Sequence, residues 1–223
     1  MSTHIESSSA QSIAVIGVGA MGGAIARAIA ATGTAVQIAN SRGPESLKDF
    51  VGDHADVIHA TTIDEAASAD IVVLTVPWSA VADTLGRAPK WNGRILIDAT
   101  NAVEFLASDS SDVTDPANPL GFLGLKAYDL AGRSSSEIVA ELAPDARVVK
   151  TFNHIEPPLL AEPNTDKGRG VIFLAGDDDD ARTKVAELLG SLGLFAADLG
   201  PLASGSLIAF PGGSLLGLGL IKP

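Results

Sequence analysis

The sequence predicts an α/β fold built on a doubly wound, mostly parallel sheet, with helices on both faces and a short C-terminal segment. Short apolar runs rich in Val and Ile alternate with helical patterns through the first half of the chain. The first run, residues 13–16, is continuously apolar, as in a strand buried on both faces, and a glycine-rich turn follows it. Strands that alternate with crossover helices form parallel sheets, so these observations together indicate the fold class.

The individual elements follow from the apolar runs and the helical spacings. Strands are expected at residues 12–16, 35–39, 57–59, 70–76, 94–98, 147–152, 171–175 and 194–197. Helices are expected at residues 20–32, 44–50, 78–85, 136–142 and 178–192. In the last helix, Val185, Leu188 and Leu192 follow the spacing of an amphipathic helix.

Three parts are expected along the chain. Residues 1–11 have no basic start and no apolar core, which is typical of a frayed, disordered tail and not of a secretory signal. Residues 12–198 form one α/β domain, and residues 199–223 form a C-terminal segment that packs on this domain or at a dimer interface. Residues 101–133 are rich in Ser, Asp, Pro and Gly and are expected to be an irregular loop.

The C-terminal segment also raises the question of a membrane span. Residues 199–221 carry no charge and are long enough to cross a bilayer. Two prolines and six glycines interrupt them, however, and no basic cluster precedes them. We therefore expect this segment to be buried against the protein or a second subunit, with no membrane partner and a cytoplasmic location.

The composition limits the chemistry that the chain can perform. Fifteen Lys and Arg stand against 27 Asp and Glu, which gives a net charge of −12 and a pI near 4.6. So acidic a surface repels phosphodiester backbones, and no nucleic-acid partner is expected. The chain has no cysteine, which excludes disulfides, thiolate nucleophiles, iron–sulfur clusters and cysteine-based zinc sites. Redox chemistry would therefore need a bound cofactor.

A glycine motif lies at the turn between the first strand and the first helix. Residues 17–22 read Gly-Val-Gly-Ala-Met-Gly, which matches G-x-G-x-x-G in the strand–turn–helix context that the motif requires. Gly17 permits the tight turn, Gly19 lets the backbone approach a pyrophosphate, and Gly22 lets the helix lie close to the strand. Amides at the helix start then face the phosphates. The motif predicts a Rossmann-like, dinucleotide-binding domain.

The residues after the second strand indicate which dinucleotide is bound. An NAD site places Asp or Glu there, whereas this chain has Asn40, followed by Ser41 and Arg42. A carboxylate would repel a 2′-phosphate, and the neutral Asn40 does not. The Ser41 hydroxyl and the Arg42 guanidinium can bind that phosphate, although Glu45 weakens the local positive potential. The turn favours NADP(H); the alternative is an ordinary polar turn with a solvated arginine.

Further candidates follow later strands, at the edge where ligands bind in open parallel sheets. They are Val76-Pro77-Trp78, Asn101 and Asn153-His154-Ile155. Trp78 is expected to form an apolar wall beside the nicotinamide ribose or to be ordinary core. Asn101 would hydrogen-bond the nicotinamide or the second substrate, or cap a turn. His154 is the histidine best placed to donate a proton, although most lone histidines are structural. Asn101 and His154 are thus the candidate catalytic residues.

The run Asp177–Asp180 resembles a metal site in composition only. It lies where a helix is expected to begin, and carboxylates there cap amide groups and complement the helix dipole. No other ligand residue has a readable spacing to it, so no metal is expected.

Several short motifs occur together in a fixed order. They are residues 16–22 (Ile-Gly-Val-Gly-Ala-Met-Gly), 40–43 (Asn-Ser-Arg-Gly), 76–78 (Val-Pro-Trp), 98–101 (Asp-Ala-Thr-Asn), 149–153 (Val-Lys-Thr-Phe-Asn), 176–178 (Gly-Asp-Asp) and 198–202 (Asp-Leu-Gly-Pro-Leu). Through them the chain resembles the NADPH-dependent reductases of the deazaflavin coenzyme F420 and their bacterial and metalloreductase-like relatives. The resemblance implies a Rossmann domain, usually in a dimer, that passes a hydride directly between NADP and a flavin-like ring.

The resemblance also implies a role for each matching residue. The pyrophosphate would be held by Gly17, Gly19, Ala20, Met21 and Gly22, and the 2′-phosphate by Ser41 and Arg42 beside Asn40. The nicotinamide ribose would lie by Val76, Pro77 and Trp78, and the second ring by Asn101, Asn153, His154 and Ile155. The family often has a small residue where His154 stands. Glu156 and the sequence from Leu207 onward also depart from the archaeal enzymes.

The expected function is that of an NADP(H)-dependent oxidoreductase that transfers a hydride directly to a ring-shaped small molecule, F420 or a flavin. Such a reaction depends mainly on positioning, with the reacting atoms about 3–3.5 Å apart. Two alternatives stay open. One is reduction of a small C=N or C=O substrate, as in pyrroline-5-carboxylate reductase, whose long helical C-terminal half has no counterpart here. The other is a non-catalytic NADP-binding sensor.

Overall fold

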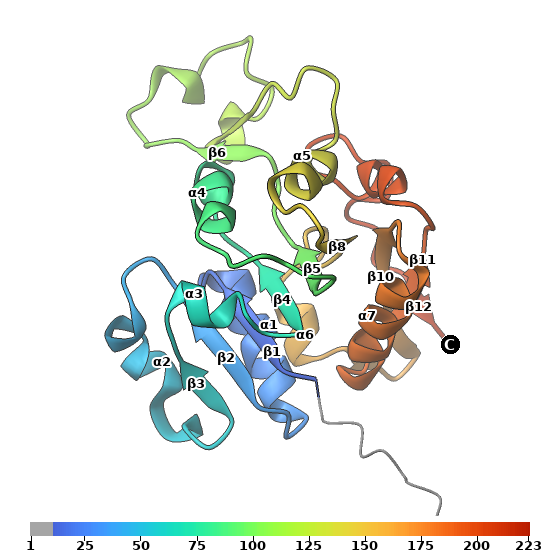
Figure 1. Cartoon of the computed structure of the whole chain (residues 1–223). Helices are drawn as coiled ribbons and strands as arrows, with labels where there is room; N and C mark the ends of the chain where they lie inside the picture. The colour runs from blue at the N-terminus through green and yellow to red at the C-terminus, as the bar shows by residue number, and fades with distance from the viewer. Residues whose placement is uncertain (1–10) are drawn as a thin grey trace, which may run out of the picture.

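A mostly parallel sheet runs through the centre of the protein (Figure 1). The computed structural model describes residues 11–223, so the tail expected at residues 1–11 falls outside the described residues except for Gln11. The strand order is β11-β10-β8-β5-β4-β1-β2-β3. Parallel pairing joins β1 (Ile13–Ile16), β2 (Val36–Ala39), β3 (Ile58–Ala60), β4 (Ile71–Leu74), β5 (Ile95–Asp98) and β8 (Arg147–Lys150). Counted along the chain, these strands lie in the order 3-2-1-4-5-6 of Rossmann domains, which confirms the predicted fold class.

The sheet continues beyond β8 with an antiparallel strand. β10 (Gly168–Gly176) runs antiparallel to β8, and β11 (Phe195–Asp198) runs parallel to β10. Two-residue strands, β9 (Asn164–Thr165) and β12 (Ile221–Lys222), pair with the first residues of β10. Such short strands have no readable periodicity, so the sequence contains no signal for them. Through β12 the end of the chain returns to the sheet.

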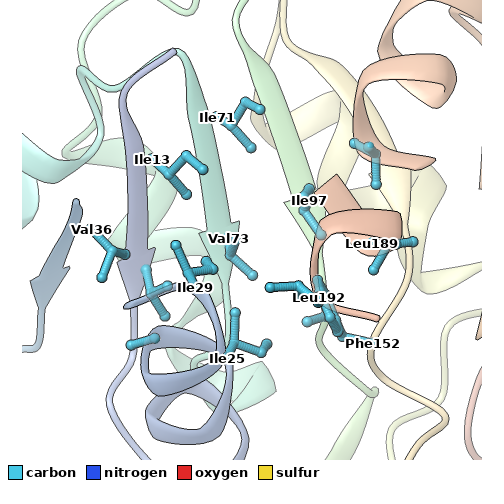
Figure 2. Packing of buried hydrophobic residues seen from close by; sticks show 14 of the residues in the cluster. Ile13, Ile25, Ile29, Val36, Ile71, Val73, Ile97, Phe152, Leu189 and Leu192 are labelled. Atoms are coloured by element: carbon cyan, nitrogen blue, oxygen red, sulfur yellow. The ribbon is translucent and has the colours of Figure 1, made fainter. Parts of the chain in front are cut away.

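Helices cover both faces of the sheet. They are α1 (Ala20–Ala31), α2 (Lys48–Val51), α3 (Ile63–Ala66), α4 (Val81–Gly86), α5 (Ser135–Leu142), α6 (Pro158–Ala161) and α7 (Asp179–Ser191). Alternate residues of β1 point to opposite faces: Ile13 and Val15 pack with α1, α6 and α7, whereas Ala14 and Ile16 pack with α3, α4 and α5. Figure 2 shows the first of these cores, where Ile25 of α1 lies against the strands.

Two of the predicted helices begin as 3₁₀ turns. Residues 44–50 fold as η1 (Pro44–Leu47) followed by α2, and residues 78–85 as η3 (Trp78–Ala80) followed by α4. A further turn, η2 (Gly52–His54), follows α2. The other predicted elements agree with the structure apart from a few terminal residues, where helix and strand assignments commonly differ.

Residues 101–133 differ from the irregular loop that the composition predicts. They contain a small antiparallel sheet of β6 (Val103–Phe105) and β7 (Leu125–Ala127), with η4 (Ser111–Val113) and η5 (Gly121–Leu123) between the strands. The amide Nδ2 of Asn118 donates to the carbonyls of Asp112 and Leu125, both at 2.9 Å, and so fixes the connection. The segment of residues 101–133 projects past α4 (Figure 1).

The C-terminal segment, residues 199–223, lies against the domain. Its first turn, η6 (Leu202–Leu207), packs on β8, β10 and α5, and Leu202 is buried there. Among residues 11–223 no helix is both long enough and apolar enough to cross a bilayer. Within the same residues no group of three or more His, Cys, Asp or Glu is arranged to hold a metal ion. Asp178 instead caps α7, because its carboxylate accepts from the Ala181 amide at 2.7 Å.

Candidate active site

Two glycines of the first turn are required by the packing of the protein itself. Gly17 has a φ of +101°, and a Cβ there would lie 2.7 Å from the Thr75 carbonyl carbon. A Cβ on Gly22 would lie 1.8 Å from the Gly17 carbonyl oxygen and 2.4 Å from Thr75 Oγ1. The Thr75 hydroxyl donates to the Gly17 carbonyl at 2.5 Å. These two glycines therefore let β1, β4 and α1 approach one another.

The third glycine has no such packing reason. Gly19 is the N-cap residue of α1, and a Cβ there would meet no protein atom within 4 Å. Within residues 11–223 no side chain caps this end of α1, and its first turn contains no acidic residue. The amide groups at the start of α1 thus face open space beside Gly19, which suits an anionic group.

A cleft of about 610 Å³ opens at this turn, and we call it the first cleft. It follows the carboxyl ends of β1, β2, β4 and β5, as expected for an open parallel sheet. The predicted cofactor residues that line it are Gly17, Gly19, Ala20, Met21, Asn40, Ser41, Arg42, Val76, Pro77, Trp78 and Asn101. Gly22 is buried beneath it. The fold thus brings together residues that are far apart in the sequence.

The turn after β2 shapes one end of the first cleft. Asn40 Oδ1 accepts from the Arg42 amide at 2.9 Å, and Asn40 Nδ2 donates to Ser46 Oγ at 2.9 Å. Asn40 therefore holds the turn, while the side chains of Ser41 and Arg42 are exposed. Glu45 forms an ion pair with Lys48, which offsets its charge. Arg42 has no ion-pair partner among the described residues.

A buried ion pair lies at the ends of β5 and β8, beneath the other end of the first cleft. Lys150 Nζ lies 3.0 Å from Asp98 Oδ2, and both side chains are fully buried. Asp98 also accepts from Ser136 Oγ at 2.9 Å and from the Thr100 amide at 2.9 Å. Lys150 donates to the Thr100 carbonyl as well. The pair thereby fixes the chain just before Asn101.

Burial sets the electrostatics of this pair. It lowers the pKa of Lys150 from its ordinary value, and the Asp98 carboxylate opposes that shift. Removing one partner of a buried pair leaves an uncompensated charge, at a typical cost of about 3–5 kcal/mol. Lys150 is a site residue that sequence reasoning missed: it belongs to a recognisable motif, but its burial beside Asp98 depends on the pairing of β5 with β8.

Two asparagines connect the sheet with the C-terminal segment. Asn101 Oδ1 accepts from Asn153 Nδ2 at 3.0 Å and from the Phe210 amide at 3.1 Å. Asn101 Nδ2 donates to the Asn153 carbonyl at 2.9 Å, and Asn153 Nδ2 also donates to the Ile208 carbonyl at 2.6 Å. Together these bonds hold Phe210 at the end of the first cleft, which it lines.

His154 follows Asn153 and is anchored to β10. Its Nε2 accepts a hydrogen bond from the Phe173 amide at 3.1 Å, so the ring proton of a neutral His154 lies on Nδ1. Burial, with a smaller contribution from the Lys150 charge, lowers the pKa of His154 to about 4. The ring is therefore neutral near pH 7. This geometry favours a positioning role for His154 over proton donation from Nε2.

A second cavity of about 690 Å³ adjoins the first cleft, and Asn101 and Phe210 line both. The candidate substrate residues Asn153, His154 and Ile155 line it, so the fold brings all three to this cavity. Its outer wall is the C-terminal run 216–221 (Leu-Gly-Leu-Gly-Leu-Ile). Phe210 and this run were not predicted as site residues. The absence of charge in the run was the available signal, but its position depends on the pairing of β12 with β10.

Comparison with known proteins identifies the family of the chain. The model of a family described as NADP oxidoreductase, coenzyme F420-dependent, matches residues 12–102. The F420-dependent NADP reductase of Methanothermobacter thermautotrophicus is 30% identical over 208 residues, which cover 88% of this chain and 84% of that protein. The chain belongs to this family. It is therefore an NADP-dependent oxidoreductase, and the resemblance seen in the sequence is confirmed.

Solved structures show the same relationship. A hypothetical protein from Sinorhizobium meliloti is 40% identical, with a TM-score of 0.82 and coverage of 96% of both chains. A candidate F420-dependent NADP reductase from an Arthrobacter species is 27% identical, with a TM-score of 0.67, covering 86% of this chain and 85% of that one. The family supports NADP(H) as the dinucleotide that this chain binds.

Proposed function

We propose that this NADP-dependent oxidoreductase transfers a hydride directly between NADPH in the first cleft and a ring-type acceptor, F420 or a flavin, in the second cavity. The observation that carries the proposal is that Asn101 and Phe210 line both cavities. Groups bound on the two sides of this boundary are neighbours, and direct hydride transfer depends on such proximity.

The residues of the first cleft fit NADP(H). The open space at Gly19 admits a pyrophosphate beside the amides of α1, and the exposed Ser41 and Arg42 suit a 2′-phosphate. Val76 and Trp78 line the first cleft, as Asn101 does. When bound, NADPH supplies the hydride; the protein binds and orients it.

The residues at the boundary position the acceptor. In this proposal Asn153, His154 and Ile155 border its ring, and Asn101 orients the groups that meet there. The Asp98–Lys150 pair fixes the backbone at Thr100, just before Asn101. Because His154 Nε2 already accepts from a backbone amide, Nδ1 carries the one proton that a neutral ring can donate. The site therefore works mainly by orientation, as hydride transfer between two rings requires.

The proposal is tested with NADPH deuterated at C4, in each of its two stereochemical forms. The purified enzyme is incubated with F420, FMN or riboflavin, and the deuterium left at C4 of the product NADP⁺ is measured by mass spectrometry. For F420 the deuterium gained at C5 of the ring is measured as well, because the hydrogen on N5 of a reduced flavin exchanges with water. The proposal is supported if one stereochemical form of NADPH loses its deuterium to the acceptor while the other form keeps its deuterium in NADP⁺. NADPH binding with no reduction of any ring and no loss of deuterium from C4 would refute it, and would favour the NADP-binding sensor.

Reduction of a small C=N or C=O substrate is the second candidate. The extensive apolar lining of the second cavity suits such a molecule as well. A C=N or C=O group needs a proton as well as a hydride; water would supply the proton, while the His154 Nδ1–H would hydrogen-bond the group and orient it. A panel of cyclic imines and ketones, assayed with wild type and His154→Gln, distinguishes this activity from ring reduction.

A further inference from the structure

The second cavity carries one charged side chain among the residues that line it. Glu156 and the neutral His154 are its titratable lining groups. The remaining walls are mostly aliphatic side chains and glycine backbone. Lys150 lies behind His154, but it is fully buried and already paired with Asp98. The chain therefore presents a single negative charge to any molecule that enters.

The nearest strands do not supply a compensating cation. Arg169 of β10 and Lys222 of β12 are paired across these strands, and neither lines the cavity. The charged groups of both lie over the Phe195 ring, each 5.6 Å from its centre. A phosphate held inside the second cavity would thus have Glu156 as the one charged side chain among the residues that line it.

The apolar walls indicate what does fit. Leu218, Leu220 and Ile221 are among the most exposed large apolar side chains of the described residues, and all three line this cavity. Covering apolar surface of this kind removes it from water, which is favourable. A flat, uncharged ring system would cover it, whereas an anionic substituent would have to be desolvated beside a carboxylate.

We propose that the second cavity selects acceptor rings without anionic substituents, and that the Glu156 carboxylate imposes this selection. The inference rests on the proposed function and ranks its substrates: uncharged rings are used in preference to rings with an anionic tail, such as FMN and F420. Glu156 is a specificity-determining residue in this proposal. Its side chain is exposed and forms no hydrogen bond or ion pair within residues 11–223, so its replacement leaves the fold intact.

The test compares matched pairs of acceptors that share one ring. Riboflavin and FMN differ by a phosphate, and 5-deazariboflavin and F420 differ by an anionic tail. A like charge close to the carboxylate should weaken binding by about tenfold through electrostatic repulsion, which corresponds to about 1.4 kcal/mol. We expect kcat/KM to favour the uncharged member of each pair by about tenfold in wild type.

Variants identify the residue responsible. In Glu156→Gln the ratio of kcat/KM for the uncharged acceptor to kcat/KM for the anionic one should fall close to one, mainly because kcat/KM for FMN rises. Glu187→Gln makes the same change in net charge at an exposed position on α7 and should leave the preference as in wild type. Equal use of riboflavin and FMN by wild type, or a preference that persists in Glu156→Gln, would overturn the inference.

Binding provides a readout that is independent of turnover. Riboflavin and FMN are titrated with enzyme saturated with NADP⁺, and quenching of flavin fluorescence gives each dissociation constant. Wild type should bind riboflavin more tightly than FMN, and Glu156→Gln should bind the two about equally. In wild type the difference between the two dissociation constants should become smaller as salt screens the charge. If selective binding is seen but no label moves from deuterated NADPH, hydride transfer is refuted while the selection stands. If label moves without selection, the selection alone is refuted.

Discussion

Asn101 and Asn153 hydrogen-bond each other across the ends of two neighbouring parallel strands. Asn153 Nδ2 donates to Asn101 Oδ1 at 3.0 Å, and Asn101 Nδ2 donates to the Asn153 carbonyl at 2.9 Å. The same two side chains bind the backbone of Ile208 and Phe210. The boundary between the first cleft and the second cavity is therefore built from side-chain amides that also fix the C-terminal segment.

Replacing Asn153 by Ala should loosen this boundary. The Ile208 carbonyl would lose its partner, and a buried group left without a hydrogen bond costs about 1–3 kcal/mol. We expect thermal unfolding to occur several degrees lower and KM for the acceptor to rise. Because Asn153 does not line the first cleft, KM for NADPH should change little. An equal rise in both Michaelis constants would contradict this account.

Two glycines of the first turn, Gly19 and Gly22, should respond differently to alanine. Gly19→Ala places a methyl group in open space, so the melting temperature should stay near that of wild type while NADPH binding weakens at least tenfold. Gly22→Ala places its methyl group 1.8 Å from a backbone oxygen. Overpacking of this kind typically costs about 1–3 kcal/mol or more, so this variant should be markedly less stable.

Calorimetric titration with NADPH and thermal denaturation distinguish the two effects. Loss of binding with retained stability in Gly19→Ala shows that the space beside Gly19 receives the ligand. Normal NADPH affinity in Gly19→Ala would show that the ligand does not approach the backbone there.

Arg42 should determine the preference for NADPH over NADH. Its side chain is exposed at the end of the first cleft, and Lys48 offsets the charge of the nearby Glu45. Loss of a charge-assisted hydrogen bond to phosphate costs about 1.5–3 kcal/mol, so Arg42→Ala should raise KM for NADPH by about tenfold to a hundredfold. KM for NADH should hardly change. Lys90→Ala, at an exposed position outside the first cleft, is the matched control for loss of a positive charge. Equal effects of Arg42→Ala on both coenzymes would refute the assignment.

The part of the site that depends on local sequence could be predicted, and the part that depends on strand order could not. Residues 17–22 and 40–42 are contiguous, and their roles follow from turn geometry and charge. The Asn101–Asn153 contact joins residues 52 positions apart, and the bond from Asn101 to Phe210 spans 109 positions. Each candidate could be placed at a strand end, but their hydrogen bonds require β5 and β8 to be neighbours.

Composition was misleading where short polar segments fold on one another. Residues 101–133 are rich in loop-forming residues, yet Asn118 and the β6–β7 pairing give them an ordered structure. For residues 216–221 the sequence showed the apolar character but not the place of the segment in the fold. Their position over the second cavity depends on β12 pairing with the start of β10.

His154 should make stability depend on pH. Its pKa in the folded protein is about 4, below the ordinary value of 6.5, because burial disfavours the charged ring. Between these two values the unfolded chain binds more protons than the folded one, so stability is greatest above pH 6.5 and is lost as the pH falls toward 4. The full difference corresponds to roughly 3 kcal/mol.

His154→Gln should remove this part of the pH dependence. The glutamine oxygen can accept from the Phe173 amide as His154 Nε2 does, but it does not titrate in this range. Urea unfolding at pH 4.5 and pH 7 should therefore show a smaller difference in the free energy of unfolding than in wild type. His59→Gln, at an exposed position on β3, should behave as wild type. An unchanged pH dependence in His154→Gln would show that His154 is not the group that gains a proton on unfolding.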